Sequence, residues 1–84
     1  MIMELPSYDT YMKAVRKARY EMKINDSQVI ILRNCFKARL RDKPLHFNYL
    51  QKATSQTKED ARWDIMDLVE KGAIRQIRPN WFMF

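Results

Sequence analysis

The chain has 84 residues, 46% of them hydrophobic, a single cysteine and a formal net charge of +6. These values predict one folded domain with a modest core, and they exclude an internal disulfide and a largely disordered chain. The first ten residues lack the basic region and the apolar stretch of a signal peptide. No run approaches the roughly 18–20 apolar residues that a membrane span requires, so we expect a cytoplasmic protein that does not contact membranes.

The first expected helix spans residues 7–23, with Ser7 or Asp9 as its N-cap. Its apolar residues share one face at helical spacing: Tyr8, Tyr11, Val15, Ala18 and Met22. The opposite side carries a stripe rich in cations: Lys13, Arg16, Lys17, Tyr20 and Lys23. This stripe fits a solvated surface, a contact with a polyanion, or a face that packs on a partner protomer.

A second helix is expected over residues 27–41, after a break that is rich in capping residues. Its apolar arc is broad: Val29, Ile31, Leu32, Cys35, Phe36, Ala38 and Leu40. An arc of this width predicts a central helix that is contacted from more than one side. Cys35 is therefore expected to be a small buried apolar residue and not a nucleophile.

The segment after Pro44 is expected to lead into a short helix that ends at Ala53. Leu45 can form a very short strand or simply fill the core. His46 or Asn48 then opens the helix. His46 is expected to be a loop or cap residue, because no second histidine or cysteine stands at metal-ligand spacing from it.

The best-marked helix runs over residues 57–71. Thr57 and Asp60 form a pair like a capping box, and Lys71 suits the C-terminal end of the helix dipole. Gly72, the only glycine of the chain, stands where a left-handed C-cap is expected. Two strands, 73–77 and 81–84, are expected to follow and to form a hairpin.

The order of these elements resembles the winged helix-turn-helix superfamily. The segment from Asp67 to Arg75 resembles the "L-x-E-K-G-L-I-R" end of a recognition helix and the start of its wing. Leu50–Thr54 resembles the short helix before the turn, and Gln28 with Ile31 and Leu32 resembles the start of the core helix. The resemblance implies a mainly α fold with a small C-terminal β-hairpin in a single domain of residues 1–84. Residues 27–84 would form the motif, and 7–23 would be an N-terminal helical extension.

The sequence departs from the superfamily pattern at the turn and at the wing. Ser55 and Gln56 occupy positions that often hold a glycine and an apolar residue. The turn at Arg78–Asn80 is short, so we expect a stubby wing.

The resemblance implies a sequence-specific protein that binds double-stranded DNA, a small transcriptional regulator acting as a dimer. Its positive charge suits this role, because residues 1–45 hold ten Lys and Arg against five Asp and Glu. The expected base-reading residues lie near the start of the helix over residues 57–71: Gln56, Lys58, Glu59, Arg62 and Trp63. Phosphate contacts are expected from seven other residues: Lys13, Arg16, Lys17, Asn48, Lys52, Arg75 and Arg78. The N-terminal helix and the C-terminal hairpin are the expected dimer surfaces.

An alternative function follows from the expected outer face of the same helix, which holds Glu59, Trp63, Met66 and Glu70. Carboxylates repel phosphates, and exposed Trp and Met suit a protein contact. The alternative is a winged-helix module that binds another protein through Trp63, Met66 and the C-terminal aromatics. Asp60, Asp64 and Asp67 on one flank are expected to be solvated. We expect no enzymatic activity, metal or cofactor, because no nucleophile–base pair, ligand cluster or glycine-rich loop stands out.

Overall fold

The computed structural model describes residues 5–84. Four helices and three short strands follow one another in this part of the chain: α1 (Tyr8–Tyr20), α2 (Asp26–Leu40), β1 (Leu45–His46), α3 (Phe47–Thr54), α4 (Lys58–Glu70), β2 (Arg75–Arg78) and β3 (Trp81–Met83). The protein is therefore mainly helical, with a small antiparallel sheet at its C-terminal end.

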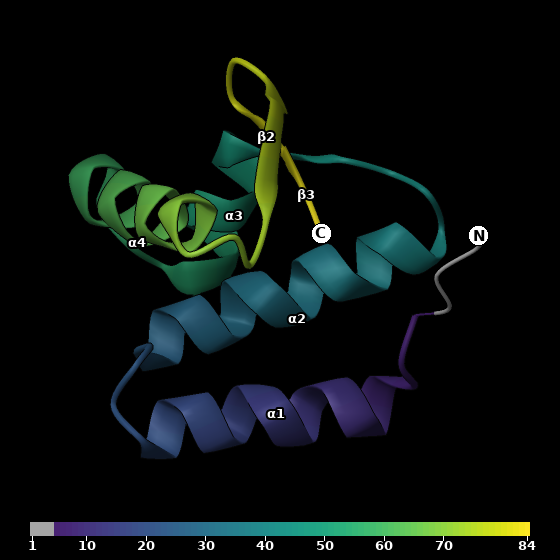
Figure 1. The fold of residues 1–84 in the computed structure, drawn as a ribbon. Coiled ribbons are helices and arrows are strands. Elements are labelled where there is room, and N and C mark those ends of the chain that lie inside the picture. Colours follow the sequence, from purple (N-terminus) through teal and green to yellow (C-terminus); the bar gives the residue numbers. More distant parts are fainter. Residues whose placement is uncertain (1–4) are drawn as a thin grey trace.

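Helix α2 lies at the centre, as its broad apolar arc predicted. It packs against α1 on one side and against α3, α4 and β3 on the other (Figure 1). Ile31, Cys35 and Phe36 are almost completely buried on α2, which confirms that Cys35 is a core residue. Tyr11 stacks on Phe36 with ring centroids 4.4 Å apart, and Phe84 meets both rings edge-on. The C-terminal residue thus closes the core between α1 and α2.

The sheet has the order β1-β3-β2, so the C-terminal hairpin gains a third strand from Leu45 and His46. Of the two roles expected for Leu45, the strand is the one observed. Phe82 lies in the central strand and is fully buried. The turn between β2 and β3 holds Pro79 and Asn80, and Asn80 has a φ of 66°, a combination that type II turns favour.

Two expectations about helix faces are wrong. Helix α1 ends at Tyr20, and Met22 adopts a left-handed φ of 62°, so Met22 leaves the apolar face and is 85% exposed. Leu40 closes α2 and is also exposed, because the buried arc of that helix ends at Ala38. Helical spacing places a side chain on a face only while the helix and its packing partner both continue.

Candidate functional site

The helix pair α3–α4 is fixed at each end by a local signal. The Asn48 N–H donates to His46 Nδ1 at 3.0 Å, so His46 is the N-cap of α3, as its isolation predicted. Ser55 ends α3 with a φ of 53°, and Thr57 caps α4 by accepting from the Asp60 N–H at 3.2 Å. Gly72 ends α4 with a φ of 76°, which confirms the expected left-handed C-cap.

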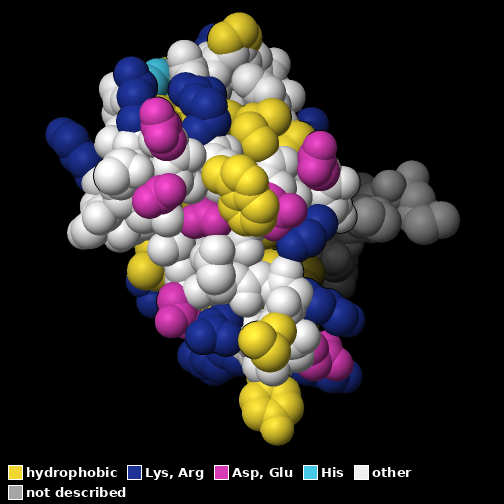
Figure 2. Space-filling model, turned by 90° about the vertical axis from the view of Figure 1, so that its left-hand side faces the viewer, with side chains coloured by type: hydrophobic (Ala, Val, Ile, Leu, Met, Phe, Trp, Pro, Cys, Tyr) yellow, Lys and Arg dark blue, Asp and Glu magenta, His cyan; other side chains and the backbone are white. Residues whose placement is uncertain are grey.

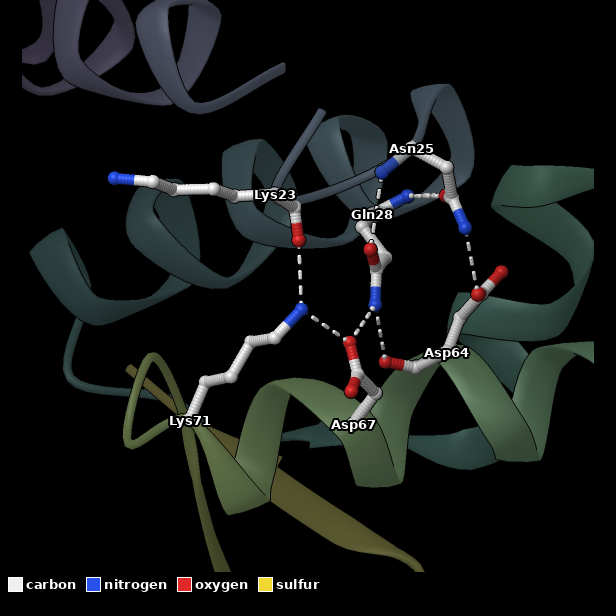
Figure 3. Close-up of polar contacts among 6 residues, drawn as sticks. All are labelled: Lys23, Asn25, Gln28, Asp64, Asp67 and Lys71. Carbon is white, nitrogen blue, oxygen red and sulfur yellow. Dashed lines mark hydrogen bonds and ion pairs between the residues drawn. The ribbon is translucent and has the colours of Figure 1, made fainter. Parts of the chain in front are cut away.

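A buried polar network joins α4 to the start of α2 (Figure 3). Asp64 is only 4% exposed, and its carboxylate accepts from Asn25 Nδ2 at 2.8 Å and from Gln56 Nε2 at 2.6 Å. It therefore ties α4 both to the α1–α2 connection and to the α3–α4 turn. The expectation that Asp64 is a solvated charge is wrong, because the amide groups beside it satisfy the carboxylate away from water.

Gln28 is the second element of this network and is almost completely buried. Its Oε1 accepts the Asn25 N–H, and its Nε2 donates to the Asp64 carbonyl at 3.1 Å and to Asp67 Oδ2 at 2.8 Å. Lys71 Nζ donates to the same Asp67 oxygen and to the Lys23 carbonyl. The bonds from Lys71 and Gln28 lower the pKa of Asp67. These hydrogen bonds thus fix the position of α4 relative to the start of α2.

Near the N-terminal end of α4, aromatic rings support two arginines. The Arg62 guanidinium lies 4.3 Å from the centre of the Phe47 ring, and its Nη2 donates to Asn80 Oδ1 at 3.4 Å. Arg78 lies 4.9 Å from the centre of the Trp81 ring, whose edge meets His46. We call this group the hairpin edge; it consists of His46, Phe47, Arg62, Arg78, Asn80 and Trp81. It brings the start of α3, the first turns of α4 and the β2–β3 turn together.

The structure places the expected base-reading residues differently from one another. Lys58, Glu59, Arg62 and Trp63 are exposed on the first turns of α4. Gln56 instead points inward, since it is half-buried and its amide is committed to Asp64. Its side chain therefore belongs to the support of α4 and not to the surface.

The expected phosphate contacts fall into two separate groups. Asn48, Lys52, Arg75 and Arg78 lie with α3 and the hairpin, whereas Lys13, Arg16 and Lys17 lie on α1, on the other side of α2 (Figure 1). The β2–β3 turn stands far from α1 in this view. The cations expected to contact phosphates are thus divided between two sites, one on either side of α2.

Sequence reasoning did not single out three residues that shape the site. In the sequence, Asn25 belongs to the break between two helices, and Asp64 has the spacing of a surface charge. Their hydrogen bond joins residues 39 positions apart, so no local sequence pattern indicates it. Asn80 read only as a turn residue, although its side chain accepts from Arg62. A sequence signal existed for Asn25 alone, because Gln28 three residues later completes a capping box.

Burial raises the pKa of the Cys35 thiol to about 12, which keeps the sulfur protonated and unreactive. Residues 5–84 contain no cluster of three His, Cys, Asp or Glu side chains that could hold a metal ion, and none of their helices is long and apolar enough to cross a membrane. Comparison of the chain with family models, curated proteins and solved structures found no match.

Proposed function

We propose that the protein is a winged helix-turn-helix domain with α1 as an N-terminal extension. Three features support this fold. The short α3 and the longer α4 follow one another across the brief turn at Ser55–Thr57. The β2–β3 hairpin follows α4 directly, in the place of a wing. The strand before α3 pairs with the second strand of that hairpin, through Leu45 and Phe82.

We further propose that the domain binds double-stranded DNA as a small transcriptional regulator, acting as a dimer. The observation that carries this proposal is the hairpin edge, where Arg62 and Arg78 are held against aromatic rings. A guanidinium that is already positioned loses less conformational freedom on binding and keeps several N–H groups for phosphates or a guanine edge. Lys58, one turn before Arg62, and Asn48 at the start of α3 extend this surface.

The charge of α4 determines how the helix can approach a duplex. α4 has two basic and five acidic residues, a net charge of −3. Both basic residues, Lys58 and Arg62, lie in its first two turns beside the exposed Glu59 and Asp60, whereas all charged residues in the rest of the helix are acidic. The helix therefore meets DNA with its N-terminal end, beside the hairpin, and not along its whole length.

Two alanine variants test which surface meets DNA. Arg62→Ala removes a supported cation of the hairpin edge, whereas Lys13→Ala removes an exposed cation of α1 on the other side of α2. We expect Arg62→Ala to weaken binding to a mixed-sequence duplex about tenfold and to lower the salt slope by about one. Lys13→Ala should leave both values near those of the wild type. An equal loss in the two variants, or a loss in Lys13→Ala alone, would overturn the assignment to the hairpin edge.

A second candidate function, docking of another protein, is favoured by one observation. Trp63 is 66% exposed in the middle of α4, and large aromatic side chains on a helix surface are typical anchors of protein interfaces. The other residues expected to dock are less accessible. Met66 is half-buried, and Phe82 and Phe84 pack in the core. Lys58→Ala discriminates the two functions, because it should weaken binding to DNA and leave a protein contact through Trp63 unchanged.

A further inference from the structure

The face formed by α4 and the end of α1 carries an unusual concentration of exposed apolar side chains. Tyr20 is 88% exposed and Met22 85% exposed, and both lie at the α1–α2 connection. Met22 and Trp63 both line one cleft of about 430 Å³. Figure 2 shows this face, with hydrophobic side chains in its middle and at its lower end and charged side chains around them. We call residues 17–23 the corner. We call the outer face of α4, which holds Glu59, Trp63, Met66 and Glu70, the acidic side.

Methionine is an unfavourable residue for the backbone conformation at position 22. Its φ of 62° lies in the left-handed region, which glycine and asparagine adopt with less strain. Its side chain is almost fully exposed, so packing within the chain does not explain why methionine stands there. A residue that is both strained locally and unused in the core is expected at a functional surface.

The charges of this face are self-complementary. The corner has three basic residues and one acidic residue, a net charge of +2. The acidic side presents Glu59 and Glu70, whereas Asp64 is buried and Asp67 is paired with Lys71, so neither adds an unpaired charge to this surface. A two-fold axis through the cleft would set the corner of one copy against the acidic side of the other, twice.

We infer that this face is the contact surface of a symmetric homodimer, with Met22 and Tyr20 of each copy packed on Trp63 of the other. The acidic residues Glu59 and Glu70 then face the corner lysines of the second copy. Tyr20 and Trp63 can each bury roughly 150–250 Å². Together they supply about 40–60% of the ~800 Å² that a standard interface buries on each partner. This inference does not depend on DNA binding, and it uses a surface other than the hairpin edge.

Paired charge reversals test the two-fold arrangement. Glu59→Lys with Glu70→Lys makes the acidic side basic, and Lys17→Glu with Lys23→Glu makes the corner acidic; all four residues are exposed. Each double variant alone sets like charges against each other, so each should stay monomeric in sedimentation equilibrium at ~100 mM salt. An equimolar mixture should form a heterodimer, because both contacts again join opposite charges. Failure of the mixture to associate would overturn the arrangement.

Apolar variants test the side-chain contacts while keeping the monomer folded. Met22→Gly removes the side chain at a φ that glycine adopts freely, and Trp63→Ala removes an exposed ring. Both should weaken self-association at least ~30-fold, with circular dichroism unchanged. Leu40→Ala is the matched control, since Leu40 is also exposed but stands at the other end of α2, and it should not alter association. A wild-type protein that remains monomeric at ~100 µM, or an equal effect of the three variants, would overturn the inference.

Discussion

Gln28→Glu isolates the contribution of the buried network that holds α4. Glutamate is the usual third residue of a capping box, so the change preserves the local start of α2. The substitution, however, replaces the Nε2 amino group of Gln28 with a carboxylate oxygen. This Nε2 donates to the Asp64 carbonyl and to Asp67 Oδ2 in the wild type. Both acceptors then face a carboxylate oxygen in a site that is 1% exposed at Gln28. Each hydrogen bond lost with a buried partner costs about 1–3 kcal/mol, so we expect a loss of roughly 3–5 kcal/mol in the free energy of unfolding at pH 7.

Urea and thermal denaturation followed by circular dichroism measure this loss, which corresponds to a fall in Tm of roughly 15–30 °C for a domain of this size. The deficit should shrink as the pH falls toward 4, because the introduced carboxyl has a raised pKa among acceptors and, once protonated, can donate to Asp67 again. Gln76→Glu is the control, since Gln76 is exposed on β2 and gains the same charge. Equal stability of the two variants would refute the role of the network.

Three further outcomes follow from individual residues. Gly72→Ala should cost about 1–2 kcal/mol, measured by urea denaturation, because a Cβ there meets no atom within 4 Å and only the φ of 76° opposes it. The free energy of unfolding should fall above about pH 9, because the Cys35 thiol ionises in the unfolded chain while burial holds its pKa near 12 in the folded state. The loss from Cys35 alone is up to ~1.4 kcal/mol per pH unit, and Cys35→Ala should reduce this alkaline slope. Arg62→Lys should weaken DNA binding almost as much as Arg62→Ala, since an ammonium cannot reproduce the planar stack on Phe47.

The elements with strong local signals could be predicted from the sequence. Thr57 with Asp60 and the lone Gly72 mark the ends of α4, and both caps are observed. The broad apolar arc predicted the central position of α2, and the isolation of His46 predicted its role as a cap. The two caps of α4 need only residues within about four positions, where local rules apply, and the arc of α2 is a pattern within a single helix.

What the sequence did not reveal depends on contacts between distant segments. Asp64 has the spacing of a surface residue on α4, and only the approach of Asn25 and Gln56 makes it a buried acceptor. Helix α1 ends at Tyr20, and Met22 adopts a left-handed φ although neither glycine nor asparagine stands at that position. The separation of the α1 cations from the hairpin arginines is likewise set by how α1 packs on α2. A charge count along the chain contains no such information.

The central proposal, DNA binding by the hairpin edge, is tested most directly by the salt dependence of wild-type binding. The affinity for a mixed-sequence duplex of ~30 base pairs would be measured by fluorescence anisotropy between 50 and 200 mM salt. With three to five phosphates neutralised, we expect log K to fall with log salt at a slope of about −3 to −4.5. No binding at 50 mM salt, or binding with a flat slope, would contradict the proposal.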